Sequence, residues 1–266
     1  MKTKDWNGQV ALVTGASSGI GAATARKLAE KGISVIITAR RAERLNTLAA
    51  EIRAAGGMVT SIPSDLSDPS KRQEFFTSAE AVYGKIDILV NNAGFGWYGY
   101  MSEMTWETAY DLIQVNIAAA TQLSLLALAG MKRSGYGHII NVGSIAGALP
   151  NQGIAVYSAS KAYLNAFTTA IHRELTGSAI HFGILLPGAV KTEFFTSIEK
   201  RPFGRRLNMD WVAITSKQVA GGVWFMLNHP RRKLYLPWWV AVSPWVELLF
   251  GGVIDLLGPM LLKSGH

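Results

Sequence analysis

Tyr157 and Lys161 lie four residues apart in the segment Tyr157-Ser158-Ala159-Ser160-Lys161. On a helix this spacing puts both side chains on one face, although it is also common on exposed helix surfaces. A free phenol has a pKa of about 10, too high for acid–base work at neutral pH, and a neighbouring cation lowers it by favouring the phenolate. Ser144 ends a predicted strand upstream and can add a hydroxyl to the pair. These side chains predict proton transfer to or from an oxygen atom.

A second chemical feature is the glycine-rich turn at residues 14–21, between a predicted strand and a predicted helix. Such a turn holds a pyrophosphate with backbone N–H groups at a positive helix N-terminus, and glycine lets the backbone approach the phosphates. The spacing is G-x-x-x-G-x-G rather than the common G-x-G-x-x-G. The strand–turn–helix context predicts a nucleotide cofactor, with contacts from Gly15, Ser17, Ser18, Gly19, Ile20 and Gly21.

The end of the second predicted strand discriminates between the two nicotinamide cofactors. About 20 residues beyond the last glycine, an acid would grip the ribose hydroxyls of NAD. Here Ala39 is followed by Arg40 and Arg41, and no acid is present. A guanidinium binds a 2′-phosphate, which a carboxylate would repel. The sequence therefore predicts NADP(H), with NADPH preferred over NADH, Arg40 as the main contact and Arg41 as a second. Two solvated arginines opening a surface helix are the structural alternative.

These groups need a scaffold that brings them together. Short β-branched apolar runs alternate with longer helical stretches, which is typical of a parallel sheet with helices on both faces. No internal repeat or linker divides the chain, so we expect an α/β fold with one domain over residues 1–233. The predicted strands cover 10–13, 34–38, 59–62, 86–90, 138–142 and 180–186, and the predicted helices cover 22–31, 41–55, 105–131 and 157–175.

Residues 234–266 form an apolar C-terminal extension. A helix is expected from Ser243 onward, with a narrow polar stripe of Glu247, Gly251 and Asp255 beside a broad apolar face. Three interpretations are open: a lid over the pocket or a subunit interface, a segment resting on a membrane surface, or an addition that covers the core. Against the membrane, interfacial helices usually carry Lys or Arg on the polar face, and this one carries acids.

Composition excludes several classes of function. The 266 residues are 49% hydrophobic and 17% charged, which excludes a disordered chain. With no cysteine, disulfides, thiolate metal sites and cysteine nucleophiles are excluded, and the five histidines show no metal-ligand spacing. The net charge is +8, concentrated between Lys191 and Lys233, without a recognisable nucleic-acid module. We therefore expect no metal and no nucleic-acid partner.

The sequence also carries few signals that would send the protein out of the cytoplasm or into a membrane. Its N-terminal residues are polar and lack the apolar core of a signal peptide. The chain contains no run of about 18 uncharged apolar residues, so we expect no ordinary transmembrane helix. We expect a cytoplasmic protein, with peripheral membrane contact through the C-terminal extension as an alternative, helped by basic residues such as Arg231, Arg232 and Lys233.

Further motifs complete a family pattern. They are Asn91-Asn92-Ala93-Gly94, Asn116 and the run Pro187-Gly188-Ala189-Val190-Lys191-Thr192, in order with the glycine-rich turn, Ser144, Tyr157 and Lys161. Over residues 8–192 the chain resembles the short-chain dehydrogenase/reductase superfamily. The resemblance implies a Rossmann-type, doubly wound fold and NAD(P)-dependent interconversion of a carbonyl compound and its alcohol. It also implies a homo-oligomer paired through the helices at 105–131 and 157–175.

The resemblance assigns a role to each matching residue. Tyr157 would pass a proton to the carbonyl oxygen as hydride arrives, Ser144 would hydrogen-bond that oxygen, and Lys161 would lower the tyrosine pKa and hold the nicotinamide ribose. Asn116, a costly amide in an otherwise apolar helix, would anchor a water in a proton relay to Lys161. The other implied cofactor contacts are Asp65, Leu66, Asn92, Ala93, Gly94, Pro187, Gly188, Val190 and Thr192.

Aromatic residues after two of these motifs predict an apolar substrate, with Phe95, Trp97 and Phe194 as the proposed contacts. The leading hypothesis is an NADPH-dependent reductase of an apolar ketone or aldehyde. One alternative is a hydroxysteroid-like or other alcohol dehydrogenase working in the oxidative direction with NADP. Another is a non-catalytic nucleotide-binding sensor, which would have no need of an acid–base tyrosine.

Overall fold

The computed structural model describes residues 5–193 and 213–263, with side chains described as far as residue 256. Seven parallel strands form one sheet in the order β3-β2-β1-β4-β5-β6-β9. Their apolar residues are covered on both faces, as in other parallel sheets. The strands are β1 (Val10–Thr14), β2 (Ser34–Thr38), β3 (Val59–Ser61), β4 (Ile88–Asn91), β5 (Gly137–Val142), β6 (Ile180–Pro187) and β9 (Lys233–Leu236).

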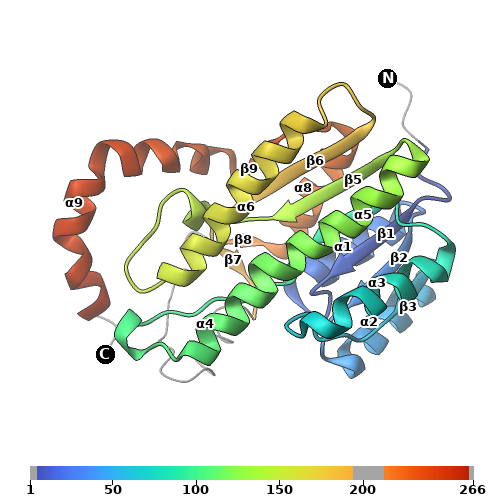
Figure 1. Cartoon of the computed structure of the whole chain (residues 1–266), viewed down its shortest axis with the longest axis horizontal. Coiled ribbons are helices and arrows are strands. Elements are labelled where there is room, and N and C mark those ends of the chain that lie inside the picture. Colours follow the sequence, from blue (N-terminus) through green and yellow to red (C-terminus); the bar gives the residue numbers. More distant parts are fainter. Residues whose placement is uncertain (1–4, 194–212, 264–266) are drawn as a thin grey trace.

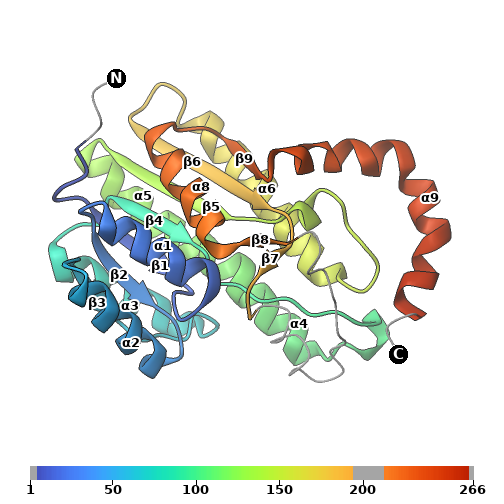
Figure 2. The same cartoon turned by 180° about the vertical axis from the view of Figure 1, so that it is seen from behind.

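Helices cover both faces of this sheet. One apolar core cluster joins the sheet to α1 (Gly19–Glu30), α2 (Ala42–Ala54) and α8 (Ser216–Asn228). A second joins the other face to α3 (Pro69–Tyr83), α5 (Ala120–Ser134) and α6 (Ala155–Glu174). Figure 1 looks onto α5 and α6, and Figure 2 looks onto α1 and α8 from behind. The predicted Rossmann-type, doubly wound α/β fold is confirmed.

The strand order places the functional loops at one edge. After β1 the chain builds outward through β2 and β3 and then returns to β4 on the other side of β1. At such a switch point the loops that follow the two strands diverge and leave a crevice outside the carboxyl ends of the strands. The segments predicted to carry chemistry, after β1, β4, β5 and β6, all reach that edge.

Two elements differ from those expected. The helix predicted over 105–131 is divided into α4 (Trp106–Ile113), a π-helical turn η2 (Gln114–Ala119) and α5. The boundary expected between residues 233 and 234 falls inside β9, which pairs with β6 from Ile184↔Lys233 to Pro187↔Leu236. In the sequence these four residues merge with the apolar extension, and only their pairing with β6 distinguishes them. The main sheet therefore extends to Leu236.

Beyond β9, a 3₁₀ turn η5 (Trp238–Val242) leads into α9 (Ser243–Lys263). Figure 1 shows α9 leaving the sheet and its helices and curving down along one end of the molecule. Within residues 5–193 and 213–263, two helical stretches are long and apolar enough to cross a membrane: Trp106–Ser134, with 39% of its window buried, and Trp238–Leu256, with 11%. The first is a core helix against the sheet. Neither stretch was expected from the sequence, because polar residues interrupt the first and acids interrupt the second.

Candidate active site

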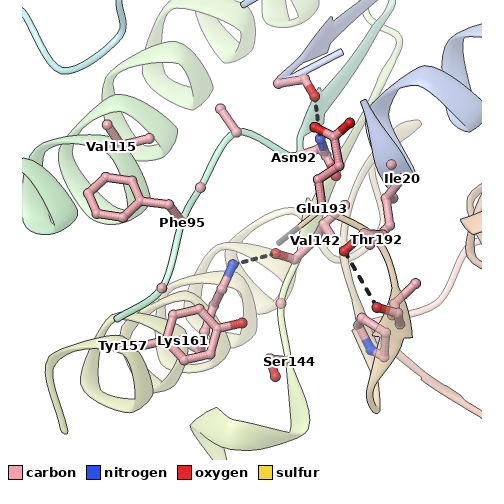
Figure 3. A pocket seen from close by; sticks show the side chains of 18 of the residues that line it. Ile20, Asn92, Phe95, Val115, Val142, Ser144, Tyr157, Lys161, Thr192 and Glu193 are labelled. Atoms are coloured by element: carbon pink, nitrogen blue, oxygen red, sulfur yellow. Dashed lines mark hydrogen bonds between the residues drawn. The ribbon is translucent and has the colours of Figure 1, made fainter. Parts of the chain in front are cut away.

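A cavity of about 570 Å³ opens at the carboxyl edge of the sheet. It extends from the glycine-rich turn, past the loops after β4 and β5, to the segment after β6. Nearly every residue predicted to contact the cofactor lines it: Gly15, Ser17, Ser18, Gly19, Ile20, Arg40, Arg41, Asp65, Leu66, Asn92, Ala93, Gly94, Tyr157, Lys161, Pro187, Gly188, Val190 and Thr192. Figure 3 shows part of this lining from close by.

The glycine-rich turn has a backbone that other residues could not follow. Gly15 and Gly19 have φ angles of 65° and 54°, in the left-handed region. Gly21 does not line the cavity, but a Cβ there would lie 2.4 Å from the carbonyl oxygen of Gly15. Ser18 is the N-cap of α1, but its hydroxyl makes no capping hydrogen bond to the helix, and the first turn of α1 holds no acid. The N–H groups and positive end of this helix therefore suit a pyrophosphate.

Thr14 and Asn92 fix this turn against the loop after β4. The Thr14 hydroxyl accepts hydrogen bonds from the backbone N–H groups of Asn92 (3.0 Å) and Ala93 (2.9 Å). The Asn92 amide donates to the carbonyl oxygens of Thr14 (2.9 Å) and Gly15 (3.2 Å). Asn92 thus holds the phosphate turn in place as well as lining the cavity.

Ser144, Tyr157 and Lys161 converge at the inner end of the cavity (Figure 3). Ser144 follows β5, and the other two lie one turn apart on α6. Lys161 is 6% exposed, and its Nζ donates to the carbonyl oxygen of Val142 at 3.0 Å and lies 5.7 Å from the centre of the Tyr157 ring. The Ser144 Oγ accepts from the backbone N–H of Ala146 at 3.1 Å.

Burial shifts the pKa values of Tyr157 and Lys161 in opposite directions. Burial raises the pKa of Tyr157 to about 12, and a hydrogen bond with Ser144 lowers that pKa in part. Burial lowers the pKa of Lys161 to about 8. The pKa of Tyr157 is therefore raised in this structure rather than lowered as expected, because desolvation of the phenolate is the largest effect on it. At neutral pH the pair is a neutral phenol beside an ammonium group.

Comparison with known proteins places this fold and cavity in a family. The model of the family described as short chain dehydrogenase matches residues 9–202. The chain belongs to the short chain dehydrogenase family. The prediction of an NAD(P)-dependent oxidoreductase is confirmed by this membership.

Two curated relatives are reductases. The ketoacyl reductase HetN of Nostoc is 35% identical over 186 residues, which are 69% of this chain and 64% of that protein. This chain therefore spans less than two thirds of the length of HetN. The 3-oxoacyl-(acyl-carrier-protein) reductase FabG of Escherichia coli is 34% identical over 190 residues, which are 71% of this chain and 76% of FabG.

Two solved structures are similar over most of the chain. A metagenomic short-chain oxidoreductase in complex with NADP has a TM-score of 0.75 and 35% identity, covering 87% of this chain and 97% of its own. A short-chain dehydrogenase from Sphingobium yanoikuyae in complex with NADPH has a TM-score of 0.80 and 29% identity, covering 94% of both chains. Both contain the phosphorylated form of the cofactor.

In this short chain dehydrogenase, Asn116 lies on the π-helical turn η2 and is 1% exposed. Its Oδ1 accepts from the backbone N–H of Phe95 at 3.0 Å, and its Nδ2 donates to the carbonyl oxygen of Phe95 at 2.9 Å and to Ser160 Oγ at 3.1 Å. The side chain is therefore used in positioning Phe95 and α6, and it does not line the cavity. The water relay implied for Asn116 stays a prediction.

A cationic cluster lies at the outer rim of the cavity, beside the glycine-rich turn. The Arg41 guanidinium donates to the hydroxyls of Ser17 (2.9 Å) and Ser18 (2.8 Å). It also forms an ion pair with Glu193 at 3.0 Å, and Arg44 binds the same carboxylate at 2.6 Å. Arg40, expected as the main phosphate contact, is exposed and lines the cavity. Arg41 is the arginine that lies against the turn.

The remaining predicted residues divide between lining and support. Asp65 lines the cavity, and its Oδ1 accepts from the backbone N–H and the hydroxyl of Ser67 at 3.0 and 2.8 Å. Phe95 and Trp97 line the cavity after β4. Phe194, the third predicted substrate contact, lies outside the described residues.

Sequence reasoning missed part of the lining. Glu193 directly follows the Pro187–Thr192 motif, but its partner Arg44 is 149 residues away, and no local pattern links them. The loop after η3 (Ile145–Gly147) adds Leu149, Asn151 and Ile154. The short helix directly after Ser144, which turns this loop back over the cavity, carries no strong sequence signal.

Proposed function

We propose that this short chain dehydrogenase uses NADPH to reduce an apolar ketone or aldehyde to its alcohol. The observation that carries the proposal is the neutral phenol of Tyr157, held beside Lys161 and Ser144 at the inner end of a cavity that begins at a phosphate-binding turn. When bound, the cofactor supplies the hydride that the substrate carbon accepts.

The residues at the outer rim favour the phosphorylated cofactor. Arg41 donates hydrogen bonds to the hydroxyls of Ser17 and Ser18 in the glycine-rich turn. A 2′-phosphate bound beside this turn would be attracted by the positive charge of the Arg41 guanidinium. Arg40 would stand on the same rim as a second contact. The NADP and NADPH complexes among the solved relatives support this choice. Asp65 and Leu66 would border the adenine, and Pro187, Gly188, Val190 and Thr192 would border the nicotinamide.

The inner residues would manage the proton. Tyr157 donates its phenolic proton to the substrate oxygen as negative charge develops there, and Ser144 donates a hydrogen bond to the same oxygen. Lys161 keeps a positive charge next to the phenol, which offsets the charge left on Tyr157 and holds the ribose nearby. Each of these groups stabilises charge that is larger in the transition state than in the substrate.

The raised pKa of Tyr157 supports catalysis of reduction at neutral pH, while the ratio of reduced to oxidised cofactor sets the net direction. Alcohol oxidation needs a tyrosinate to accept a proton, and a pKa raised to about 12 makes tyrosinate scarce at neutral pH. Carbonyl reduction needs the phenol, which is the dominant form. A non-catalytic sensor is disfavoured because it gains nothing from a buried ammonium beside a buried phenol, an arrangement that costs free energy.

The substrate side of the cavity is apolar. Its lining includes five apolar or aromatic side chains: Phe95, Trp97, Val115, Leu149 and Ile154. An alkyl chain or ring system would fit such walls, with the carbonyl directed at Ser144 and Tyr157. The 3-oxoacyl and ketoacyl compounds named for the curated relatives are carbonyl compounds of this kind.

We also infer that the chain forms a homo-oligomer through α5 and α6. Leu125 on α5 and Tyr163 on α6 are 60% and 37% exposed, which leaves apolar surface for a second subunit. Sedimentation equilibrium tests this, and a monomer at all concentrations would contradict it.

Rates of NADPH oxidation test the proposed reaction with a series of straight-chain ketones of increasing length. We expect kcat/KM to rise with chain length, because each added methylene buries apolar surface against the cavity wall. NADPH binding without turnover of any ketone would contradict the proposal and favour a sensor.

A further inference from the structure

Helix α9 turns its apolar side outward. Leu248, Leu249 and Leu256 are 72%, 69% and 77% exposed, and Trp245 is 63% exposed. The opposite side of the helix is half-buried and includes Glu247, Gly251 and Ile254. A helix of a water-soluble domain has the reverse arrangement, with its apolar side toward the core. The polar stripe expected from the sequence thus lies partly on the inner side, and no segment that the structure describes covers the apolar side.

The outward surface matches lipid better than protein. From Trp238 to Leu256 the exposed side chains are apolar except for Asp255. A protein interface has a polar rim with hydrogen-bonding groups around its apolar centre. Tryptophans concentrate at the junction of lipid and water, and three of them, Trp238, Trp239 and Trp245, stand at the start of this segment.

The acids decide how deep the segment can lie. Glu247 and Asp255 fall within the stretch Trp238–Leu256, whose length and hydropathy suffice for a membrane crossing. A carboxylate at the bilayer centre is costly, so a crossing would bury charge without a partner. A helix lying in the interface keeps both acids near water. Figure 1 also shows α9 following a curved course rather than one straight axis.

The basic residues that the structure describes next to this segment contribute little electrostatic attraction to the contact. The basic residues Arg231, Arg232 and Lys233 stand at the amino end of β9, whereas α9 follows its carboxyl end. A strand of this length separates them by about 13 Å, more than the Debye length of about 8 Å at physiological ionic strength. Insertion must therefore depend on the apolar side chains.

The inner side of α9 contacts a loop whose residues also line the cavity. Gln152 donates from its Nε2 to the backbone oxygen of Ile254 at 3.4 Å. Its neighbours Asn151 and Ile154 line the cavity, so one loop joins α9 to the substrate side. A bilayer that covers α9 would therefore lie close to this loop of the cavity wall.

We propose that α9 lies embedded in one leaflet of a lipid bilayer and that the cavity takes its carbonyl substrate from that bilayer. The binding part stands on the exposed surface of α9 alone. The substrate part rests on the proposed reductase function and narrows it to long-chain, lipid-like ketones or aldehydes. Such a substrate could pass from the leaflet to Tyr157 without crossing water.

Flotation of the full-length protein with phosphatidylcholine vesicles tests the binding part. We expect the wild type to float with these uncharged vesicles at low and at high salt. The double variant Leu248→Gln/Leu249→Gln should stay with unbound protein, since its substitutions are on exposed positions and remove only apolar contact. The control Met58→Gln/Val82→Gln, which alters exposed apolar residues elsewhere, should float like the wild type.

Three results would overturn the binding part. They are a wild type that does not float, flotation only with anionic vesicles that salt abolishes, and a wild-type oligomer in the absence of lipid that the α9 variant dissociates. The last result would identify α9 as a contact between subunits.

Rates with two ketones, one short and one long, test whether the substrate comes from the bilayer separately from whether the protein is a reductase. With a short, water-soluble ketone the α9 variant and the wild type should have equal kcat/KM. With a long-chain ketone held in vesicles the variant should lose about tenfold or more, because it loses the raised local concentration. Equal losses on both ketones would contradict delivery from the bilayer. Flotation without turnover of either ketone by the wild type would contradict the reductase function and leave the membrane contact standing.

Discussion

The inner end of the cavity and its outer rim hold similar charged groups in opposite surroundings. At the inner end Lys161 is 6% exposed, and burial lowers its pKa to about 8. At the rim the side chains of Arg41 and Glu193 are 46% and 50% exposed. Hydrogen bonds from Arg44 and Arg41 lower the pKa of Glu193. Charges interact strongly at the buried inner end, so we expect its groups to stabilise the transition state and control the rate. Water screens the charges at the rim, so we expect its groups to make smaller contributions that affect which cofactor binds.

The largest effect should come from Tyr157→Phe, which removes only the proton donor. We expect kcat to fall about 10³-fold, within the range typical of general acid catalysis, with the Kd for NADPH unchanged. Rates of NADPH oxidation and a fluorescence titration measure the two quantities. Tyr163→Phe is the matched control, because that hydroxyl lies on the same helix and contacts Thr121 at 3.0 Å. If Tyr157→Phe kept a kcat near that of the wild type, Tyr157 would not be the proton donor.

The pH dependence of reduction should show the buried lysine. Lys161 carries its charge below a pKa of about 8 and loses it above, so kcat should decline as pH rises through about 8. Tyr157, with a pKa of about 12, stays protonated over this range and does not contribute to the decline. Lys161→Arg keeps the charge and should have a flat profile near pH 8. If the kcat of the wild type stayed constant up to about pH 10, the pKa of Lys161 would lie near its ordinary value, and burial would not lower it to about 8.

Most of the inner end could be predicted from the sequence because its signals are local. Tyr157 and Lys161 are one helical turn apart, and the glycine-rich turn is a single contiguous segment. The alternation of strands and helices then brings the strand ends to one edge, where Ser144 also lies. The pKa of Tyr157 could not be predicted in this way, because it depends on how many atoms from distant segments enclose the ring.

The parts that the sequence did not predict depend on contacts between distant segments. Strand β9 is recognisable only through its pairing with β6. The π-helical turn at Asn116 sits in a stretch whose composition favours an unbroken helix. The stretches Trp106–Ser134 and Trp238–Leu256 are both apolar enough for a membrane, yet one packs on the sheet and the other does not. Hydropathy alone cannot separate them.

At the rim, Arg41→Ala should weaken NADPH binding by about tenfold to a hundredfold, the range for hydrogen bonds to a charged group. The Kd for NADH should not change, because NADH has no 2′-phosphate. Arg40→Ala should cause a smaller loss, since Arg41 is the arginine held against Ser17 and Ser18. Titrations of both cofactors with both variants measure this. A larger loss for Arg40→Ala would restore Arg40 as the main contact.

The smallest effect should come from Glu193→Gln, and its sign is the informative part. The carboxylate of Glu193 shares Arg41 and Arg44 and would repel a 2′-phosphate on the same rim. Removing its charge should tighten NADPH binding about twofold to fivefold, as expected for an exposed ion pair, and leave NADH binding and kcat unchanged. Glu51→Gln is the matched control, because Glu51 pairs with Arg26 on the exposed surface of α1 and α2. Weaker NADPH binding in Glu193→Gln would mean that Glu193 orients Arg41 for the phosphate rather than competing with it.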